Sequence, residues 1–221
     1  GVHLLNLLAI PAMAVVYYFR RSKKTSTKGA IISLFAGIII LGFIQYGIIQ
    51  YLIKFGANFD LLFVNTFGLG FGTGVLFFTM LVVGATVYLI QYSIKKKKPI
   101  LNLAMLSFVF IIFGYSSYAM IIIRAKANPT LNNSDPGDAF AFLSYLNREQ
   151  YGDRPLLYGQ NFDAKPIDSK MGANIYRKGD TKYDIAGQKQ TYVYDKQTLF
   201  PRMYSDDANH PEVYRDWMNL G

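Results

Sequence analysis

Long apolar runs without charge are the feature that most constrains this chain. Three of them, residues 30–53, 75–94 and 100–123, contain no Asp, Glu, Lys, Arg or His. Each is long enough to cross a bilayer as a helix, which takes about 20 apolar residues. A further run, residues 2–19, is about one span long and carries Pro11, which we expect to kink it. The sequence therefore predicts an α-helical polytopic membrane protein with about four transmembrane helices.

The distribution of basic residues predicts the orientation of these helices. Residues 1–134 hold twelve Lys/Arg and one acid, and residues 135–221 hold eleven Lys/Arg and thirteen acids, which together give the totals of 23 and 14. Nine of the first twelve lie in the turns "RRSKKTSTK" and "KKKKP". Short loops rich in Lys/Arg stay in the cytoplasm. We therefore expect the loop Tyr51–Gly74 and everything after Arg124 to face outwards; the alternative for the lysine run is specific lipid binding.

Composition also excludes several classes of function. The chain has no cysteine, which removes disulfides, thiolate metal sites and thiol catalysis. The polar tail has no cluster of Lys/Arg, so nucleic acid is not an expected partner. The chain opens at Gly1 inside an apolar run, with neither Met nor a basic region before it. We interpret it as an internal piece of a longer membrane protein.

The polar part, residues 124–221, is predicted to be an incomplete extracytoplasmic domain, with residues 1–123 as the membrane region. Asp135 is the expected N-cap of a helix, with Pro136 in its first turn, and Gly152 is expected to end that helix. "RPLLYG" is typical of a short buried strand and "QTYVYD" of an alternating one. This order predicts the start of a small α/β or α+β domain.

Two features of the outer loop could carry chemistry. "NTFGLGFGTG" is rich in glycine but lacks the strand and the lysine ending of a phosphate-binding loop, so close packing or a re-entrant turn is the simpler interpretation. Asp60 is the single acid of the first 134 residues, and it could be a catalytic base, a metal ligand or the cap of a short interfacial helix. One carboxylate alone does not define a site.

Cations and a histidine provide the remaining candidates. Arg124 and Lys126 directly follow the last span, where they could anchor the helix or bind a lipid-linked phosphate. His210 has acids nearby without the spacing of a metal site, which favours a polar surface turn. We expect no metal site in this chain and no cofactor is evident.

Several segments in this order resemble a known family. They are an Arg-x-x-Ala-Asn-Pro segment (Arg124–Pro129), the block "YLNREQYG" (Tyr145–Gly152), "LLFVNTFGLGFGTG" and "LFPRMYS". The chain resembles a polytopic membrane family of Bacteroidota related to the transmembrane protein O-mannosyltransferases. The resemblance covers nearly the whole chain, although Asp60 and Gly70 stand where Glu and Pro are expected.

The resemblance implies a glycosyltransferase of the C type in the bacterial inner membrane, multi-pass, with its tail in the periplasm. Such an enzyme moves a sugar from a polyprenyl-phosphate donor to an exported acceptor protein. The catalytic acid is then expected in an outward loop ahead of Gly1, with Asp60 as a weak candidate within the chain, and a metal requirement stays open. The substrate-binding candidates are Arg124, Asn128 and Asn65.

Two other classes of function stay open. A non-enzymatic anchored module would use its spans only to hold an interaction or scaffold domain. A transporter usually has charges or broken helices inside the membrane, and three of these runs have no charge. The polar residues within the runs are expected to form hydrogen bonds between helices; they are Gln45, Gln50, Gln91 and Asn102.

Overall fold

The structure is a computed structural model. It describes residues 4–127, 129–130, 132, 135–149, 152, 155, 157–201, 207 and 209–219. The chain divides into two compact units, which are described separately. Unit 1 comprises Gly1–Asn147 together with Gly179–Tyr183, and unit 2 comprises Arg148–Lys178 together with Asp184–Gly221.

The first apolar run forms one arm of a helical hairpin in unit 1. A 3-10 helix, Leu4–Leu8, continues into α1 (Ala9–Arg21), so the backbone changes its helical type two residues before Pro11. α1 packs against α2 (Thr27–Gly42). A Cβ on Gly37 would lie 2.6 Å from the Pro11 Cα, so only glycine permits this approach.

α2 continues without a break into a much longer helix than the sequence predicts. A π-helical segment, η2 (Phe43–Gln50), joins α2 to α3 (Tyr51–Asn65), and Thr27–Asn65 is 39 residues long. At 1.5 Å per residue this is roughly 58 Å, about twice the hydrocarbon thickness of a bilayer. The prediction of a loop over Tyr51–Gly74 is wrong for its first two-thirds, because α3 extends the helix to Asn65.

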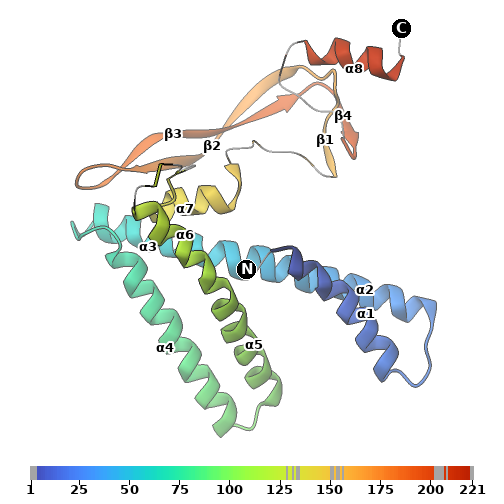
Figure 1. Cartoon of the computed structure of the whole chain (residues 1–221), viewed down its shortest axis with the longest axis vertical. Coiled ribbons are helices and arrows are strands. Elements are labelled where there is room, and N and C mark those ends of the chain that lie inside the picture. Colours follow the sequence, from blue (N-terminus) through green and yellow to red (C-terminus); the bar gives the residue numbers. More distant parts are fainter. Residues whose placement is uncertain are drawn as a thin grey trace. The chain divides into compact units, whose positions relative to one another are not determined.

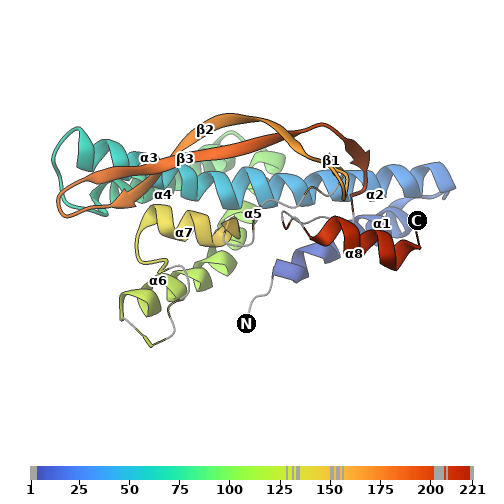
Figure 2. The same cartoon turned by 90° about the horizontal axis from the view of Figure 1, so that it is seen from above.

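The third and fourth runs form a second helical hairpin (Figures 1 and 2). Its elements are α4 (Thr73–Lys95), α5 (Pro99–Tyr115), a 3-10 turn η3 (Ser116–Tyr118) and α6 (Ala119–Lys126). Asn102 donates a hydrogen bond from Nδ2 to Ser93 Oγ over 2.9 Å, joining α5 to α4. The prediction that Asn102 bonds between helices is therefore confirmed.

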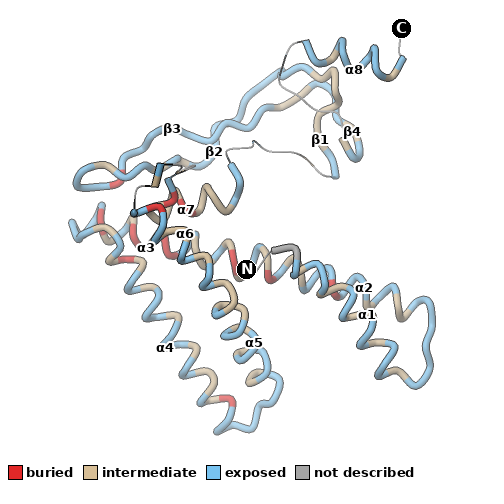
Figure 3. The backbone as a smooth tube through the Cα atoms, viewed as in Figure 1, coloured by how far each residue is buried: buried red, intermediate tan, exposed pale blue. Residues whose placement is uncertain are grey.

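Three helical segments are long and apolar enough to cross a membrane: Thr27–Asn65, Thr73–Lys95 and Pro99–Lys126. Few of their residues are buried in the isolated chain, as the mostly pale blue and tan tubes of α4 and α5 in Figure 3 show. Large apolar side chains facing outwards along whole helices require lipid or other helices around them. The chain is a mostly helical membrane protein. Within the described residues, α1 is only 13 residues long and is not among the three segments.

α3 crosses the beginning of α4. Ring contacts connect three successive turns of α3, at Phe55, Phe59 and Phe63, to one turn of α4 at Phe77 and Phe78, with centroids 5.2–6.4 Å apart. One turn of α4 meets three turns of α3 only if the two helices cross. Gly74 lies at this crossing, where an added Cβ would collide with the backbone of α3.

The first helix after the spans, α7 (Ala139–Leu146), is shorter than predicted. Its N-cap is Asp138, whose carboxylate accepts hydrogen bonds from the amides of Phe140 and Ala141. Asp135 instead lies in a turn at φ +34°, so the prediction of Asp135 as the cap is wrong. Asp138 has the extended backbone that a cap needs, and the Pro-Gly pair before it forms the turn. α7 packs on α3.

Unit 2 is a small β domain with one helix. β1 (Tyr158–Gln160) pairs antiparallel with β4 (Gln197–Leu199), and β2 (Pro166–Lys178) pairs with β3 (Tyr183–Tyr194). α8 (His210–Met218) follows. β3 contains all but the last residue of the predicted alternating strand "QTYVYD". β1 overlaps only the last two residues of "RPLLYG", and Leu157 and Tyr158 are 68% and 60% exposed, so the prediction of a buried strand there is wrong. β2 and α8 were not predicted.

The glycine at the helix crossing can be tested by substitution. We expect Gly74→Ala to lower the free energy of unfolding by about 1–3 kcal/mol, because the methyl group forces α3 and α4 apart. Gly84→Ala is the matched control in the same helix, since nothing lies within 4 Å of its added Cβ. Thermal unfolding in detergent, followed by circular dichroism, compares the two; equal midpoints would contradict the crossing.

Candidate functional site: a buried carboxylate joint

Asp60 is the centre of the most connected polar cluster in unit 1. It lies on α3 and is 1% exposed. Oδ1 accepts hydrogen bonds from the backbone amides of Gly72 at 2.9 Å and Gly74 at 3.0 Å, with Val75 further away at 3.4 Å. Oδ2 accepts a hydrogen bond from the Tyr183 hydroxyl at 2.7 Å. We call Asp60, Gly72, Gly74, Asn65 and Tyr183 the carboxylate joint.

The joint exists because the start of α4 has no cap of its own. The first amides of a helix have no partner within the helix, and a side chain or water must satisfy them. The N-cap residue of α4 is Gly72, which has no side chain and a φ of +90° that favours glycine. Asp60 therefore supplies from α3 the acceptor that a Ser or Asp cap would normally give. Its carboxylate also lies at the positive end of the α4 dipole.

Tyr183 closes the joint from the other end of the sequence. It follows the turn Gly179–Lys182, and it is 3% exposed. The rings of Phe71 and Phe140 meet its ring edge-on, with centroids 5.0 Å and 5.1 Å away. Burial raises the pKa of the Tyr183 phenol, and the hydrogen bond to Asp60 raises it further. Tyr183 therefore stays protonated at neutral pH and acts as a hydrogen-bond donor.

Asn65 fixes the backbone of the same tyrosine. Its Nδ2 donates to the Tyr183 carbonyl at 2.8 Å, and its Oδ1 accepts from the Tyr183 amide at 2.9 Å. This two-point pairing satisfies both backbone groups, as a neighbouring strand would. The side chain and the backbone of one residue are thus held by two residues of α3. The turn that joins β2 to β3 is anchored on the helices of unit 1.

The joint determines what Asp60 and Asn65 can do. A general base needs a lone pair directed at the proton that it removes. Four donors occupy the carboxylate of Asp60, and it is closed to solvent. The carboxamide of Asn65 is likewise engaged on both sides with Tyr183. Both side chains, two of the predicted site residues, are positioned to hold structure together.

The other predicted site residues lie apart from the joint. Arg124 and Lys126 are exposed in the last turn of α6, and neither forms an ion pair with another described residue. Asn128 lies outside the described residues. Two cations directly after an apolar helix are available to an anion at the membrane surface.

The sequence did not predict the two partners that complete the joint, Gly72 and Tyr183. The left-handed turn at Gly72 was detectable as part of the glycine-rich loop, and an isolated acid in an apolar half is a signal for a cap. Tyr183 is one of 17 tyrosines and has no distinguishing neighbours. Nothing local in the sequence pairs residue 60 with residue 183.

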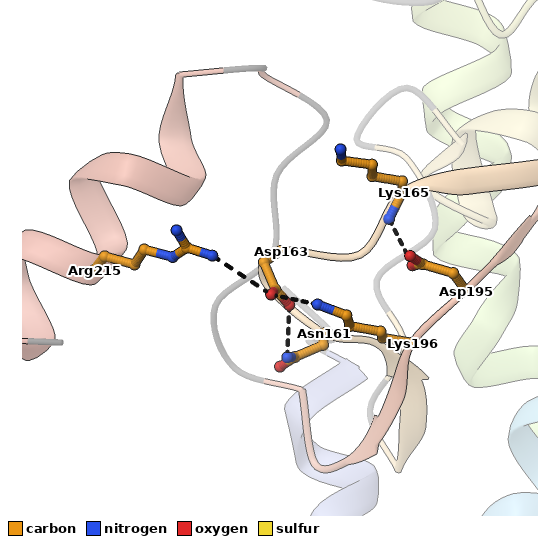
Figure 4. A network of polar contacts seen from close by, with 6 residues as sticks. All are labelled: Asn161, Asp163, Lys165, Asp195, Lys196 and Arg215. Atoms are coloured by element: carbon orange, nitrogen blue, oxygen red, sulfur yellow. Dashed lines mark hydrogen bonds and ion pairs between the residues drawn. The ribbon is translucent and has the colours of Figure 1, made fainter. Parts of the chain in front are cut away.

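Unit 2 has a polar cluster of its own, centred on Asp163 (Figure 4). Lys196, just before β4, donates to Asp163 Oδ2 at 2.7 Å, and Asn161 donates to Oδ1 at 2.8 Å. Arg215 on α8 lies 3.8 Å from the same carboxylate. The hydrogen bond from Lys196 lowers the pKa of Asp163, and the same bond raises the pKa of Lys196. The cluster joins the turn after β1 to β4 and to α8.

No group of three or more His, Cys, Asp or Glu residues that could hold a metal ion occurs in the part of the chain that the structure describes. His210 lies 3.8 Å from Asp207, one turn earlier in the sequence, and its ring packs near Tyr214. His210 is half-exposed and begins α8, so the last three residues of "DDANHPE" are helical where a surface turn was expected.

The fold and the joint together define the class: a helical membrane protein that carries a small β domain. The profile of a family of unknown function (DUF8416) matches residues 152–221. This stretch covers unit 2 from Gly152 onwards, together with the turn Gly179–Tyr183 that belongs to unit 1. No curated protein and no solved structure matches the chain.

The hydroxyl of Tyr183 gives a direct test of the joint. We expect Tyr183→Phe to lower the free energy of unfolding by about 1.5–3 kcal/mol, because it removes a buried hydrogen bond to a charged group. Amide exchange at Gly72 and Gly74 should accelerate, since their acceptor loses its second anchor. The control is Tyr192→Phe, whose exposed hydroxyl makes only a 3.4 Å contact with Gln190. Exchange unchanged in Tyr183→Phe would contradict the joint.

Acid should weaken the Asp163 cluster. A carboxyl with a lowered folded pKa stabilises the fold above its unfolded value near 3.8, and this contribution disappears as pH falls through the folded pKa. Lys196, with a raised pKa, keeps its contribution below about 10.5 and loses it above its folded pKa. We therefore expect Asp163→Asn to be less stable than the wild type at pH 7, with the difference disappearing as the pH falls through the lowered folded pKa of Asp163.

Trp217 is the single tryptophan of the chain and lies in α8, so its fluorescence follows urea unfolding near the cluster. Asp168→Asn is the matched control, because among the described residues the Asp168 carboxylate bonds only the neighbouring Ser169 amide. A stability difference between Asp163→Asn and the wild type that is independent of pH would contradict the assignment.

Proposed function

We propose that this chain is part of a membrane-embedded glycosyltransferase. It would move a sugar from a polyprenyl-phosphate donor to an exported protein on the periplasmic face of the bacterial inner membrane. The resemblance of Arg124–Pro129, Tyr145–Gly152 and the outer glycine-rich segment to the protein O-mannosyltransferase-like family suggests this activity. About four spans, the first formed by the 3-10 helix and α1, would enclose part of the donor.

Orientation supports the proposal. The basic turns between α1 and α2 and between α4 and α5 fit the cytoplasmic side. The outer end of α3, the start of α4 and the end of α6 then share the opposite side. A donor carried on a lipid presents its phosphate at the depth of these helix ends, and the exported acceptor reaches the same side.

The observation that carries the proposal is the carboxylate joint. Transfer from a lipid-borne donor requires the acceptor-binding part of an enzyme to be held at the membrane surface, because reacting atoms must approach within about 3–3.5 Å. Tyr183 is fixed by α3 through both its hydroxyl and its backbone. The turn between β2 and β3 is thereby attached to the outer end of the helices.

Within this proposal, the residues have different roles. Arg124, with Asn128 in the same segment, would bind the phosphate of the donor, since a guanidinium offers several donors in a planar fork. Lys126 would add charge at the same depth. Asn65 and Asp60 would position the hairpin turn, and the catalytic acid would come from a part of the enzyme outside this chain. A divalent metal is compatible with the scheme but has no assigned ligand.

The hydrogen bonds that occupy the carboxylate of Asp60 favour a second function. With its carboxylate occupied by four donors, the outer loop offers no free base. The chain could then be a non-enzymatic anchored module whose helices hold unit 2 as an interaction domain. The two functions differ in whether glycan transfer needs the cation at residue 124.

The test is genetic and biochemical. We expect a strain without the full-length protein to lose sugar from exported glycoproteins, seen as faster migration and loss of lectin binding. Arg124→Gln should restore the protein but lower transfer by about tenfold or more, because a hydrogen bond between charged groups contributes about 1.5–3 kcal/mol. Membrane transfer assays with a polyprenyl-phosphate sugar measure this loss.

The control is Lys170→Gln, which removes a cation from an exposed position of β2. Single cysteines at Ser169 and Ser26 in the cysteine-free chain establish topology, with Ser169→Cys labelled from outside and Ser26→Cys only after lysis. Normal glycosylation in the deletion strain would overturn the transferase and leave the anchored module. Labelling of Ser26→Cys from outside would overturn the orientation.

A further inference from the structure

Four consecutive lysines, Lys95–Lys98, form the turn that joins α4 to α5 (Figure 1). The segments on either side, Thr73–Lys95 and Pro99–Lys126, are both long and apolar enough to cross a membrane. A turn of three residues between two such helices lies at the membrane surface. The four lysines are exposed, and none forms an ion pair with another residue that the structure describes.

The backbone of this turn is fixed by a Schellman motif at the end of α4. The Lys98 amide donates to the Ser93 carbonyl at 2.8 Å, and the Lys97 amide donates to the Ile94 carbonyl at 3.1 Å. These two hydrogen bonds define the motif, and they place Lys97 in the left-handed region, at φ +50°. Ser93 is buried, and its hydroxyl accepts a hydrogen bond from Asn102 of α5. The turn therefore has a defined geometry on which the lysines are carried.

Lys97 occupies the position at which a Schellman motif normally has glycine. A residue with a Cβ is disfavoured in the left-handed region, so local stability alone would favour glycine there. The macrodipole of α4 favours a cation at Lys95, in the last turn, but this effect fades beyond the helix end. Residues that break a local rule are expected at functional sites. The lysine at residue 97 thus indicates a use for its charge.

The charges of the turn have no counter-ion within the membrane unit. The Cα atoms of Lys95–Lys98 span at most roughly 11 Å, close to the Debye length of about 10 Å at 0.1 M salt, so the four cations repel one another. Asp60 is the single acid of residues 1–134, and its carboxylate is occupied by four donors. Lys98 Nζ lies 5.2 Å from the centroid of the Tyr92 ring, which places this ammonium but leaves its charge. An anion from outside the chain would relieve the repulsion.

We propose that the turn Lys95–Lys98 is a binding site for the phosphate of an anionic membrane lipid. An ammonium is a point charge with three donors and binds phosphate well. Ile94 and Ile100 flank the lysines and are 64% and 84% exposed. Cations next to exposed apolar side chains complement a lipid, whose phosphate and acyl chains are joined, whereas a free phosphate would leave the isoleucines uncovered. The site is independent of the proposed sugar transfer.

Lipid binding to the full-length protein in neutral detergent tests the site. Bound phosphatidylglycerol is counted by native mass spectrometry, with phosphatidylcholine of the same acyl chains as the lipid without net charge. We expect phosphatidylglycerol to bind more tightly, and Lys96→Gln with Lys97→Gln to weaken its binding about 25-fold, since each lysine contributes about fivefold. The control, Lys165→Gln with Lys170→Gln, removes two exposed cations of unit 2 and should change the affinity less than about twofold. Equal affinities for the two lipids, or for the two double variants, would overturn the proposal.

Lys97→Gly separates lipid binding from stability, because the two should change in opposite directions. Glycine relieves the left-handed strain and should raise the thermal midpoint in neutral detergent by ~1–3 °C, while phosphatidylglycerol binds about fivefold more weakly. Lys97→Arg keeps the charge and should keep the affinity. A lower midpoint in Lys97→Gly would show that the lysine stabilises the turn itself and would overturn the functional interpretation. Glycerol phosphate that stabilises the protein as much as phosphatidylglycerol does would overturn the assignment to a lipid.

Discussion

The amides at the start of α4 need a hydrogen-bond acceptor, and the packing of α3, α4 and Tyr183 depends on the residue that provides it. α4 follows a left-handed glycine that has no side chain to act as a cap, so its first amides need an acceptor from elsewhere. Asp60 provides the acceptor from a neighbouring helix. For this to work, α3 must extend beyond the apolar run and cross the beginning of α4, and Gly74 must lie at the crossing.

The same carboxylate explains why a hairpin turn from a distant part of the sequence belongs to the membrane unit. Three backbone amides bond Oδ1 of Asp60, and Oδ2, which the Gly72 amide also contacts at 3.0 Å, can still accept a further hydrogen bond. Tyr183 donates that bond from within a ring-lined site, where burial keeps its hydroxyl protonated. Once the tyrosine is placed, Asn65 can pair with its backbone. Each step needs the previous one, because an isolated buried carboxylate would destabilise the fold.

The sequence predicted the parts of this arrangement that depend on local composition. The uncharged runs of span length correspond to α4 and the α5–α6 segment. They could be predicted because the apolar character of each residue is visible in the sequence. The extension through α3 was missed because Lys54, Asn58 and Asp60 interrupt the apolar run, whereas α3 is held as a helix by its packing on α4 and α7. β2 was missed because its lysines, glycine and asparagine show no alternation, and its stability comes from pairing with β3.

Site residues were predicted less well, for a physical reason. A carboxylate in an outward segment can be a base, a metal ligand or a cap, and the sequence contains the carboxylate but not its donors. The donors of Asp60 are backbone amides twelve to fifteen residues away and a hydroxyl 123 residues away. Backbone groups have no sequence signature, and long-range pairs depend on the tertiary fold. Arg124 was easier to interpret, because its charge and its position directly after an apolar run can both be read from the local sequence.

The engagement of Asp60 also limits where transfer chemistry could occur. A base must exchange its proton during each catalytic cycle, whereas a cap must keep its acceptors occupied to hold α4 and Tyr183 in place. Asp60 is 1% exposed and four donors already occupy its oxygens, so a substrate hydroxyl cannot reach it without displacing one of them. In the proposed transferase, the acid would therefore come from another segment. The exposed cations of α6 and the anchored turn before β3 would then position the two substrates around it.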